Sequence, residues 1–213
     1  MKIKKFPQSC ILIETAGKKI LVDPGTVKYE QTFLKDWKTA DAILITHRHS
    51  DHINADILKT LNIPIYSTNE VKKYNPDLSI NIIKQGDNFK IGNIKIEVTK
   101  AIHGFTTVDA EIFENVGFII DNGKAKLYIT SDTLRFNYPY KADFLFADIT
   151  AYDVSMNLWG AMMTYKEVGA KLLIVAHQDK GMMLYEKEQI EKYFSEQKIN
   201  FIIPQIGDEL ELK

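Results

Sequence analysis

The stretch Thr46-His47-Arg48-His49-Ser50-Asp51-His52 holds three of the five histidines of a 213-residue chain, together with a carboxylate. It follows the apolar run 42–45 and precedes the segment 53–59, whose apolar residues suit one face of a helix. The cluster is therefore expected on a turn between a buried strand and a helix, where binding and catalytic groups are often held. Imidazole and carboxylate together suit zinc and related divalent metals, so this turn predicts a metal site. The alternative is a polar surface loop that happens to be rich in histidine.

The composition indicates a globular protein and argues against a nucleic-acid-binding, secreted or membrane-spanning one. Hydrophobic residues make up 45% of the chain and charged residues 26%, and the net charge is −1. We expect one domain over residues 1–213, since no linker-like stretch divides the chain. Acids and bases are interleaved, which argues against an extended nucleic-acid surface. Cys10 is the only cysteine, and neither a secretion signal nor a membrane-spanning run is seen, so a cytoplasmic location is expected.

The hydrophobic pattern predicts two β-rich halves, each followed by helices. Strands are expected at 10–14, 19–23, 42–45, 64–67, 80–83, 88–91, 94–98, 116–121, 125–130, 143–148, 171–176 and 201–203, with edge pairing at 209–212. Helices are expected near 33–37, 53–59, 70–74, 160–170 and 185–197. The strands at 80–83, 88–91 and 94–98 are expected to be antiparallel, and those at 116–121 and 125–130 are expected to form a hairpin. The fold class is therefore α/β: a four-layered αββα sandwich of two mixed sheets flanked by helices.

Three further candidate ligands share one position relative to the predicted strands. His103, Asp132 and His177 each follow an apolar strand. Strand ends that meet at one edge of two packed sheets would bring these residues to the 47–52 turn. For each residue alone, the alternative is a hydrogen-bonded structural role.

The pattern His47-x-His49-x-Asp51-His52 after an apolar strand resembles the signature of the metallo-β-lactamase fold superfamily of metal-dependent hydrolases. The run 20–25, Ile-Leu-Val-Asp-Pro-Gly, is similar to the second strand and turn of that family. The resemblance implies two divalent metal ions, with zinc as the default and Mn²⁺ or Fe²⁺ as alternatives. It implies a first metal held by His47, His49 and His103, a second held by Asp51, His52 and His177, and a bridging carboxylate from Asp132. It also implies that Asp23 orients a metal-bound histidine.

The same resemblance implies hydrolysis by a hydroxide shared between the metals, with Asp51 as the catalytic residue that orients it or carries its proton. Segment 6–14 is similar to a branch of sugar-phosphate lactonases. Asp132-Thr133 and the run 158–162 are similar to a branch of phosphodiesterases and tRNA-processing ribonucleases. The expected substrate is a small-molecule ester, lactone or phosphodiester. The alternative is a non-catalytic metal-binding or metal-sensing protein.

One irregular segment is a candidate wall for the substrate. It lies between Asp132 and the helix expected from residue 160, and it contains Arg135, Tyr152 and Trp159. An arginine there could pair with a phosphate or carboxylate of the substrate.

Overall fold

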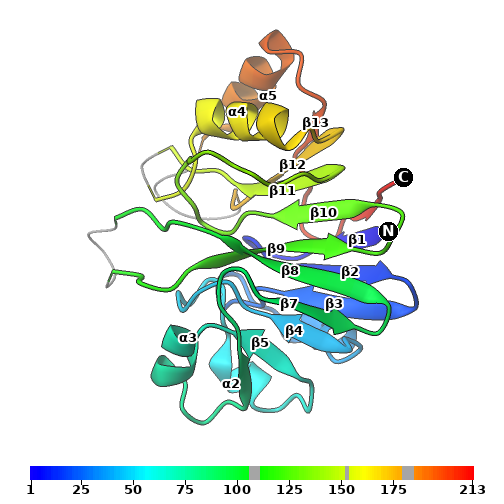
Figure 1. The fold of residues 1–213 in the computed structure, drawn as a ribbon, viewed down its shortest axis with the longest axis vertical. Helices are drawn as coiled ribbons and strands as arrows, with labels where there is room; N and C mark the ends of the chain where they lie inside the picture. Colours follow the sequence, from blue (N-terminus) through cyan, green and yellow to red (C-terminus); the bar gives the residue numbers. More distant parts are fainter. Residues whose placement is uncertain (106–110, 152–153, 179–184) are drawn as a thin grey trace.

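The computed structural model describes residues 1–105, 111–151, 154–178 and 185–213. Its strands form two sheets that stack face to face, with helices on the outer faces (Figure 1). This arrangement confirms the predicted αββα sandwich.

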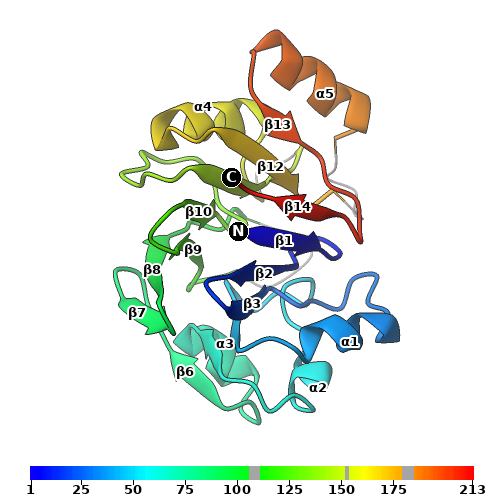
Figure 2. The ribbon, with the colours of Figure 1, turned by 90° about the vertical axis from the view of Figure 1, so that its right-hand side faces the viewer.

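The first sheet contains the amino-terminal strands and the last strand. Its strands are β1 (Lys2–Lys5), β2 (Ile11–Thr15), β3 (Lys18–Val22), β4 (Ala42–Leu44), β5 (Ile65–Ser67), β6 (Ile80–Ile82) and β14 (Glu209–Glu211). Their order is β14-β1-β2-β3-β4-β5-β6. β1 pairs with β14, so the two ends of the chain lie side by side (Figure 2).

The second sheet contains the middle of the chain. Its strands are β7 (Asn88–Ile91), β8 (Ile94–Lys100), β9 (Val116–Asp121), β10 (Lys126–Ile129), β11 (Phe144–Asp148), β12 (Leu172–Ala176) and β13 (Phe201–Ile202). Their order is β13-β12-β11-β10-β9-β8-β7. β7 to β10 are antiparallel, whereas β10 to β13 are parallel because crossover segments connect them.

Three apolar layers hold the sandwich together. The central layer lies between the sheets, and its members include Ile20, Leu44, Phe118 and Phe146. A second layer lies between the second sheet and helices α4 (Leu158–Val168) and α5 (Lys187–Glu196). The third lies between the first sheet and helices α1 (Leu34–Trp37), α2 (Ala55–Leu58) and α3 (Asn69–Tyr74). Both faces of each sheet are therefore covered, which explains the continuous apolar runs of the inner strands.

Two features differ from the sequence prediction. β1 was not expected, because Lys2, Lys4 and Lys5 mask the alternation; yet the Lys5 side chain is buried, and its ammonium group donates to the carbonyls of Phe6 and Gln8. β6 was expected to be antiparallel, and this was wrong, because it pairs in parallel with β5 at the edge of the first sheet.

No helix among the described residues is long and apolar enough to cross a membrane.

Candidate metal centre

The 46–52 turn follows β4 and lies against the turn that follows β3. The Thr26 amide donates to the Ser50 carbonyl at 2.8 Å, and the Asn54 amide donates to the Pro24 carbonyl at 2.7 Å. Between these two bonds Gly25 touches the backbone of Asp51, so closely that a Cβ on Gly25 would lie 1.8 Å from the Asp51 carbonyl oxygen. The turn is therefore fixed by backbone contacts on one side.

Thr46 and Asp23 orient two of the histidines. The Thr46 hydroxyl donates to Asp23 Oδ2 at 2.8 Å, and His47 Nδ1 lies 3.0 Å from the same hydroxyl oxygen. Since that hydroxyl has only one proton, it accepts from His47 Nδ1–H, which directs the lone pair of His47 Nε2 into the site. Asp23 Oδ2 also accepts from His52 Nδ1 at 2.9 Å. Asp23 thus lies where the resemblance implied, and Thr46 has an orienting role that the sequence did not show.

The first group of candidate ligands is His47, His49 and His103, each of which has a ring nitrogen within 4.8 Å of the others. His103 Nδ1 lies 2.6 Å from the Gly104 carbonyl oxygen. A carbonyl can only accept, so His103 carries its proton on Nδ1 and offers the lone pair of Nε2. This group comes from both sheets, because His103 follows β8 while the other two follow β4.

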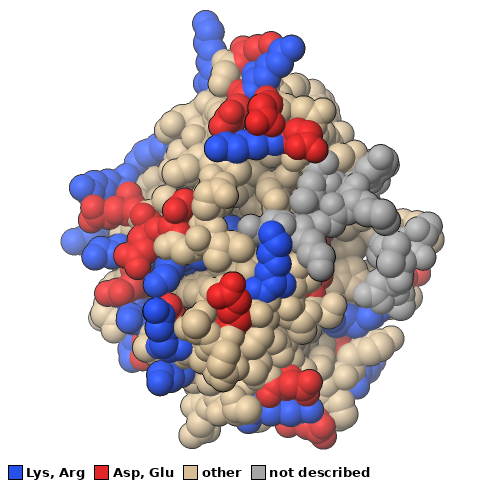
Figure 3. All heavy atoms as spheres, turned by 180° about the vertical axis from the view of Figure 1, so that it is seen from behind, with Lys and Arg blue, Asp and Glu red and all other residues tan. Residues whose placement is uncertain are grey.

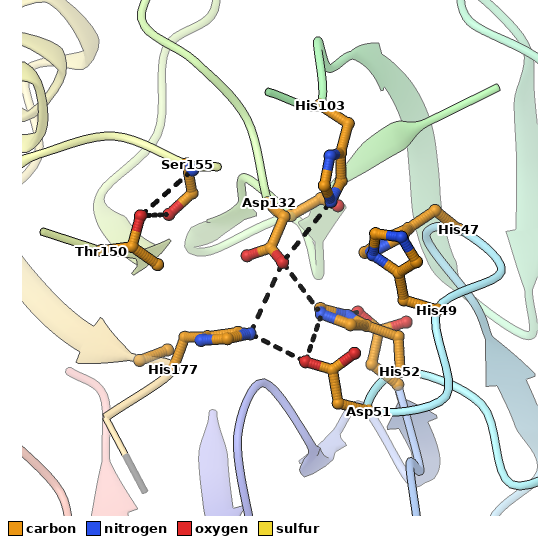
Figure 4. Close-up of polar contacts among 12 residues, drawn as sticks. His47, His49, Asp51, His52, His103, Asp132, Thr150, Ser155 and His177 are labelled. Carbon is orange, nitrogen blue, oxygen red and sulfur yellow. Dashed lines mark hydrogen bonds and ion pairs between the residues drawn. The ribbon is translucent and has the colours of Figure 1, made fainter. Parts of the chain in front are cut away.

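The second group is Asp51, His52, Asp132 and His177, again with ligand atoms within 4.8 Å of one another. His177 Nε2 lies 2.9 Å from Asp51 Oδ2 and 3.5 Å from Asp132 Oδ2. Asp132 Oδ2 is also 3.3 Å from His52 Nε2 and 3.8 Å from His103 Nε2, so one carboxylate reaches both groups. Figure 4 shows Asp132 between His177 and His103. All seven predicted site residues are therefore brought together at one edge of the sandwich.

The backbone is strained at three points around this centre. Asp23, Ser131 and His177 have φ values of 46°, 66° and 64°, in the left-handed region that non-glycine residues rarely adopt. Each follows a parallel strand or precedes a ligand. Such strain persists only where the surrounding structure holds it, and it is concentrated at functional sites.

The buried carboxylates of the second group attract positive charge, which raises the pKa of the neighbouring imidazoles. Burial lowers the pKa of His177, but Asp132 and Asp51 outweigh it and raise that pKa to about 9. The pKa of His52 is likewise raised, against its burial, by the surrounding carboxylates. Burial raises the pKa of Asp132, but His177 and His52 lower it overall to about 2. Protons therefore occupy imidazoles of the second group in a site whose carboxylates stay charged.

The first group differs, because it holds only imidazoles. Burial, together with the neighbouring histidines, lowers the pKa of His47 well below its ordinary value. His47 is neutral near pH 7, which is the form that binds a metal. Both groups fit divalent cations: the donors are imidazole and carboxylate, the side chains are mostly buried, and three Nε2 atoms are aimed inward by partners on Nδ1.

Several supporting residues were not expected from the sequence. Asn115 donates from its amide to the Asp132 carbonyl at 2.6 Å and accepts from the Ser131 hydroxyl at 2.7 Å. Asp148, at the end of β11, is fully buried, and burial together with Asp132 raises its pKa to about 7. Neither residue has a sequence signal, because an isolated Asn or Asp at the end of a strand is usually a turn residue.

The candidate substrate wall is only partly described. Arg135 makes an ion pair with Glu167 and lies over the Trp159 ring, 5.4 Å from its centre. Its guanidinium is thus already engaged by a carboxylate of α4, while 53% of Trp159 is exposed. Tyr152 lies outside the described residues.

Comparison with known proteins decides the family. Residues 2–177 match the family described as the beta-lactamase superfamily domain. The chain belongs to this superfamily. A UPF0173 metal-dependent hydrolase from Flavobacterium johnsoniae is 33% identical over 140 residues, which is 62% of each chain. Another, from Geobacillus thermodenitrificans, is 30% identical over 196 residues, 83% of this chain and 85% of that protein.

The matches to the first of the curated relatives span somewhat less than two-thirds of those proteins' own length. Among solved structures, Igni18, a metallo hydrolase from the archaeon Ignicoccus hospitalis, has a TM-score of 0.81 and 22% identity and covers 100% of this chain and 99% of its own. At that identity the structure shows a shared fold. The metallo-β-lactamase fold implied by the sequence is thereby confirmed.

Proposed function

We propose that this beta-lactamase superfamily member is a metal-dependent hydrolase with a dinuclear centre. The observation that carries the proposal is the position of Asp132, whose Oδ2 lies within 3.8 Å of His103 Nε2 in one group and within 3.5 Å of His177 Nε2 in the other. A carboxylate shared by two three-residue groups is the arrangement a bridging ligand requires. The names of the relatives support the hydrolase activity.

We assign the groups as the family resemblance implied: His47, His49 and His103 hold one ion, and Asp51, His52 and His177 hold the other. Zinc suits this imidazole-rich set best, and the same donors also bind Mn²⁺ and Fe²⁺. When bound, two such ions supply hydroxide near neutral pH and stabilise negative charge that develops on a substrate oxygen. No nucleophilic side chain is then required.

Asp51 is the residue best placed to act beyond ligation. Its side chain is 22% exposed, whereas those of Asp132 and His52 are at most 2% exposed. One carboxylate oxygen, Oδ2, is hydrogen-bonded to His177 Nε2 at 2.9 Å. With its other oxygen Asp51 can orient the attacking water and accept its proton.

The surface charge and the family support a proposal for the class of substrate. Acidic and basic side chains lie beside one another on the face in Figure 3, which favours a small molecule over a long polyanion. We therefore propose a small ester, lactone or phosphodiester. The second candidate, a non-catalytic metal-binding protein, is separated from the first by the following experiment.

The test compares metal content with turnover for the wild type and Asp51→Asn. The panel contains a lactone, a carboxylic ester, a thioester and a phosphodiester. We expect the wild type to hold about two zinc ions and to hydrolyse one class. Asp51→Asn should retain at least one ion and lose turnover by about 10²-fold or more. Asp56→Asn, whose side chain is 94% exposed in α2, is the control and should match the wild type. A fully loaded wild type that is inert on the whole panel would establish the non-catalytic alternative.

A further inference from the structure

A groove of about 370 Å³ lies at the edge of the sandwich that carries the metal centre. Its walls are the residues that follow β5 and β6, the end of β8, and the segment 113–116 that leads into β9. β4, β5 and β6 run parallel, so the carboxyl ends of β5 and β6 point the same way as the end of β4, from which His47 emerges. This is the edge at which α/β sheets bind ligands.

The groove and the metal centre share supporting residues. Asn115 lines the groove, and its side-chain amide donates to the Asp132 carbonyl. Ala101, on the opposite wall, precedes His103 by two residues. The groove therefore lies against the segments that lead to Asp132 and His103.

One wall of the groove is held rigidly by buried charge. Glu70 Oε2 accepts hydrogen bonds from the Phe113 amide at 3.0 Å and the Glu114 amide at 2.8 Å. Its other oxygen binds Arg48 Nε at 3.1 Å, and both of these side chains are less than a tenth exposed. Glu114 in turn accepts from the Glu70 amide at 2.7 Å. The backbone of Phe113 is therefore fixed to the turn that carries His47 and His49.

The side chain on that fixed backbone is nevertheless open to solvent. Phe113 is 78% exposed, and Ile82, across the groove, is 56% exposed. Exposing a large aromatic ring has no benefit for folding, while holding it in one place lowers the entropy cost of binding a ligand. These two residues form an apolar surface.

The groove also carries positive charge. Lys84 and Lys100 line it, and among the described residues neither ammonium group makes an ion pair with a carboxylate. Lys100 Nζ lies 5.1 Å from the centre of the Phe136 ring. The one carboxylate of the lining, Glu114, is already bonded to the Glu70 amide. An apolar wall beside two lysines complements an anion that has an aromatic or branched apolar body.

We propose that this groove binds the part of the substrate that is not hydrolysed, and that it selects small anionic molecules with an aromatic group. The proposal rests on the proposed hydrolase function. Phe113 packs on the aromatic group, and Lys84 and Lys100 receive the carboxylate or phosphate. Glu70 and Arg48 are positioning residues that hold Phe113 in place.

Binding of anilinonaphthalene sulfonate to the folded, zinc-loaded protein tests this without requiring turnover. Fluorescence titrations compare the wild type with Phe113→Ala and Lys84→Glu, and we expect the dissociation constant to rise about tenfold in each. Two matched variants serve as controls: Phe105→Ala removes another aromatic side chain, 75% exposed, from outside the groove, and Lys124→Glu reverses a charge at the β9–β10 turn. Neither control should change the constant. Circular dichroism verifies that all four variants are folded.

Competition identifies the anion. Phenylacetate and phenyl phosphate are each added to the dye complex, and displacement by one but not the other distinguishes a carboxylate from a phosphate ligand. Acetate and inorganic phosphate, which lack the ring, should displace the dye poorly. Equal affinity in all five proteins, or an equal loss in groove and control variants, would overturn the groove proposal. This experiment measures binding and not turnover. A protein that hydrolysed none of the esters would therefore refute the proposed hydrolase function, while the result for ligand binding in the groove would still hold.

Discussion

Gly25 has a steric role at the metal centre. Its φ lies outside the left-handed region, so conformational freedom is not what the position requires. What excludes a side chain is the Asp51 backbone, whose carbonyl oxygen and carbon would lie 1.8 and 2.2 Å from an added Cβ. Backbone atoms cannot yield as a flexible side chain can.

Gly25→Ala should therefore displace the turn that carries Asp51. We expect a loss of about 1–3 kcal/mol in the free energy of unfolding, with a larger relative loss of bound metal. Denaturant unfolding and metal analysis measure the two effects. Gly160→Ala is the control, because a Cβ there meets its nearest neighbours at 3.4 Å and the position is helical. If Gly25→Ala kept its full metal content, the close approach of Gly25 to the Asp51 backbone would not be needed to hold the ligands in place.

At the residue level, the grouping of the candidate ligands could be predicted, and the residues that support them could not. His47, His49 and Asp51 form a local pattern, and His103 and His177 follow strands that their apolar runs reveal. Asn115, Arg48 and Glu70 act through contacts between residues 17 to 44 positions apart, which exist only once the sheets have packed. A single sequence carries no signal for such pairs.

Among the elements, the segment 111–116 connects the two halves of the site. It is bonded to Glu70 at the start of α3 on one side and to Asp132 on the other, and the Val116 amide donates to the Thr46 carbonyl at 3.2 Å. The Arg48–Glu70 ion pair is the buried part of this connection. Arg48 also lies 4.3 Å from the centre of the Tyr74 ring and donates to the Glu111 carbonyl.

Glu70→Gln should weaken this connection strongly, because it removes the negative charge from the buried Arg48–Glu70 ion pair. We expect a loss of about 3 kcal/mol in the free energy of unfolding, measured by urea denaturation. The matched control is Asp41→Asn, which breaks the more exposed pair with Lys18 and should cost less than about 1 kcal/mol. If the two variants lost equal free energy of unfolding, burial would not increase the contribution of the Arg48–Glu70 pair to stability.

The two mispredicted elements, β1 and β6, have different physical causes. β1 contains a lysine whose buried ammonium group is satisfied by backbone carbonyls, so its sequence looks like a solvated tail. β6 alternates like an antiparallel strand, but a strand at a sheet edge has one exposed face whichever way it runs. By contrast, the hairpin of β9 and β10 around Asn122 and Gly123 was predicted correctly, because its turn residues are local.

On the scale of the whole molecule, the metal centre joins two sheets that each supply part of it. The first sheet supplies the 46–52 turn, and the second supplies His103, Asp132 and His177. Buried carboxylates at this junction must be balanced by positive charge, either from metal ions or from protons on His52 and His177. Metal binding and protonation are therefore alternatives for the same site.

Removing the metal should consequently make the protein take up protons. In the metal-free form the pKa of His177 is about 9 and that of His52 is also raised, whereas metal-bound imidazoles are neutral. At pH 8 we expect a chelator to cause uptake of about two protons per chain, measured with an indicator dye in weak buffer after subtraction of a metal–chelator blank. The sign follows from the raised pKa: the metal-free fold gains stability from this protonation below about pH 6.5 and loses it as the pH rises through 9. Uptake should therefore shrink above pH 9 and be smaller in His177→Gln, while proton release at pH 8 would contradict the assignment of these imidazoles as ligands.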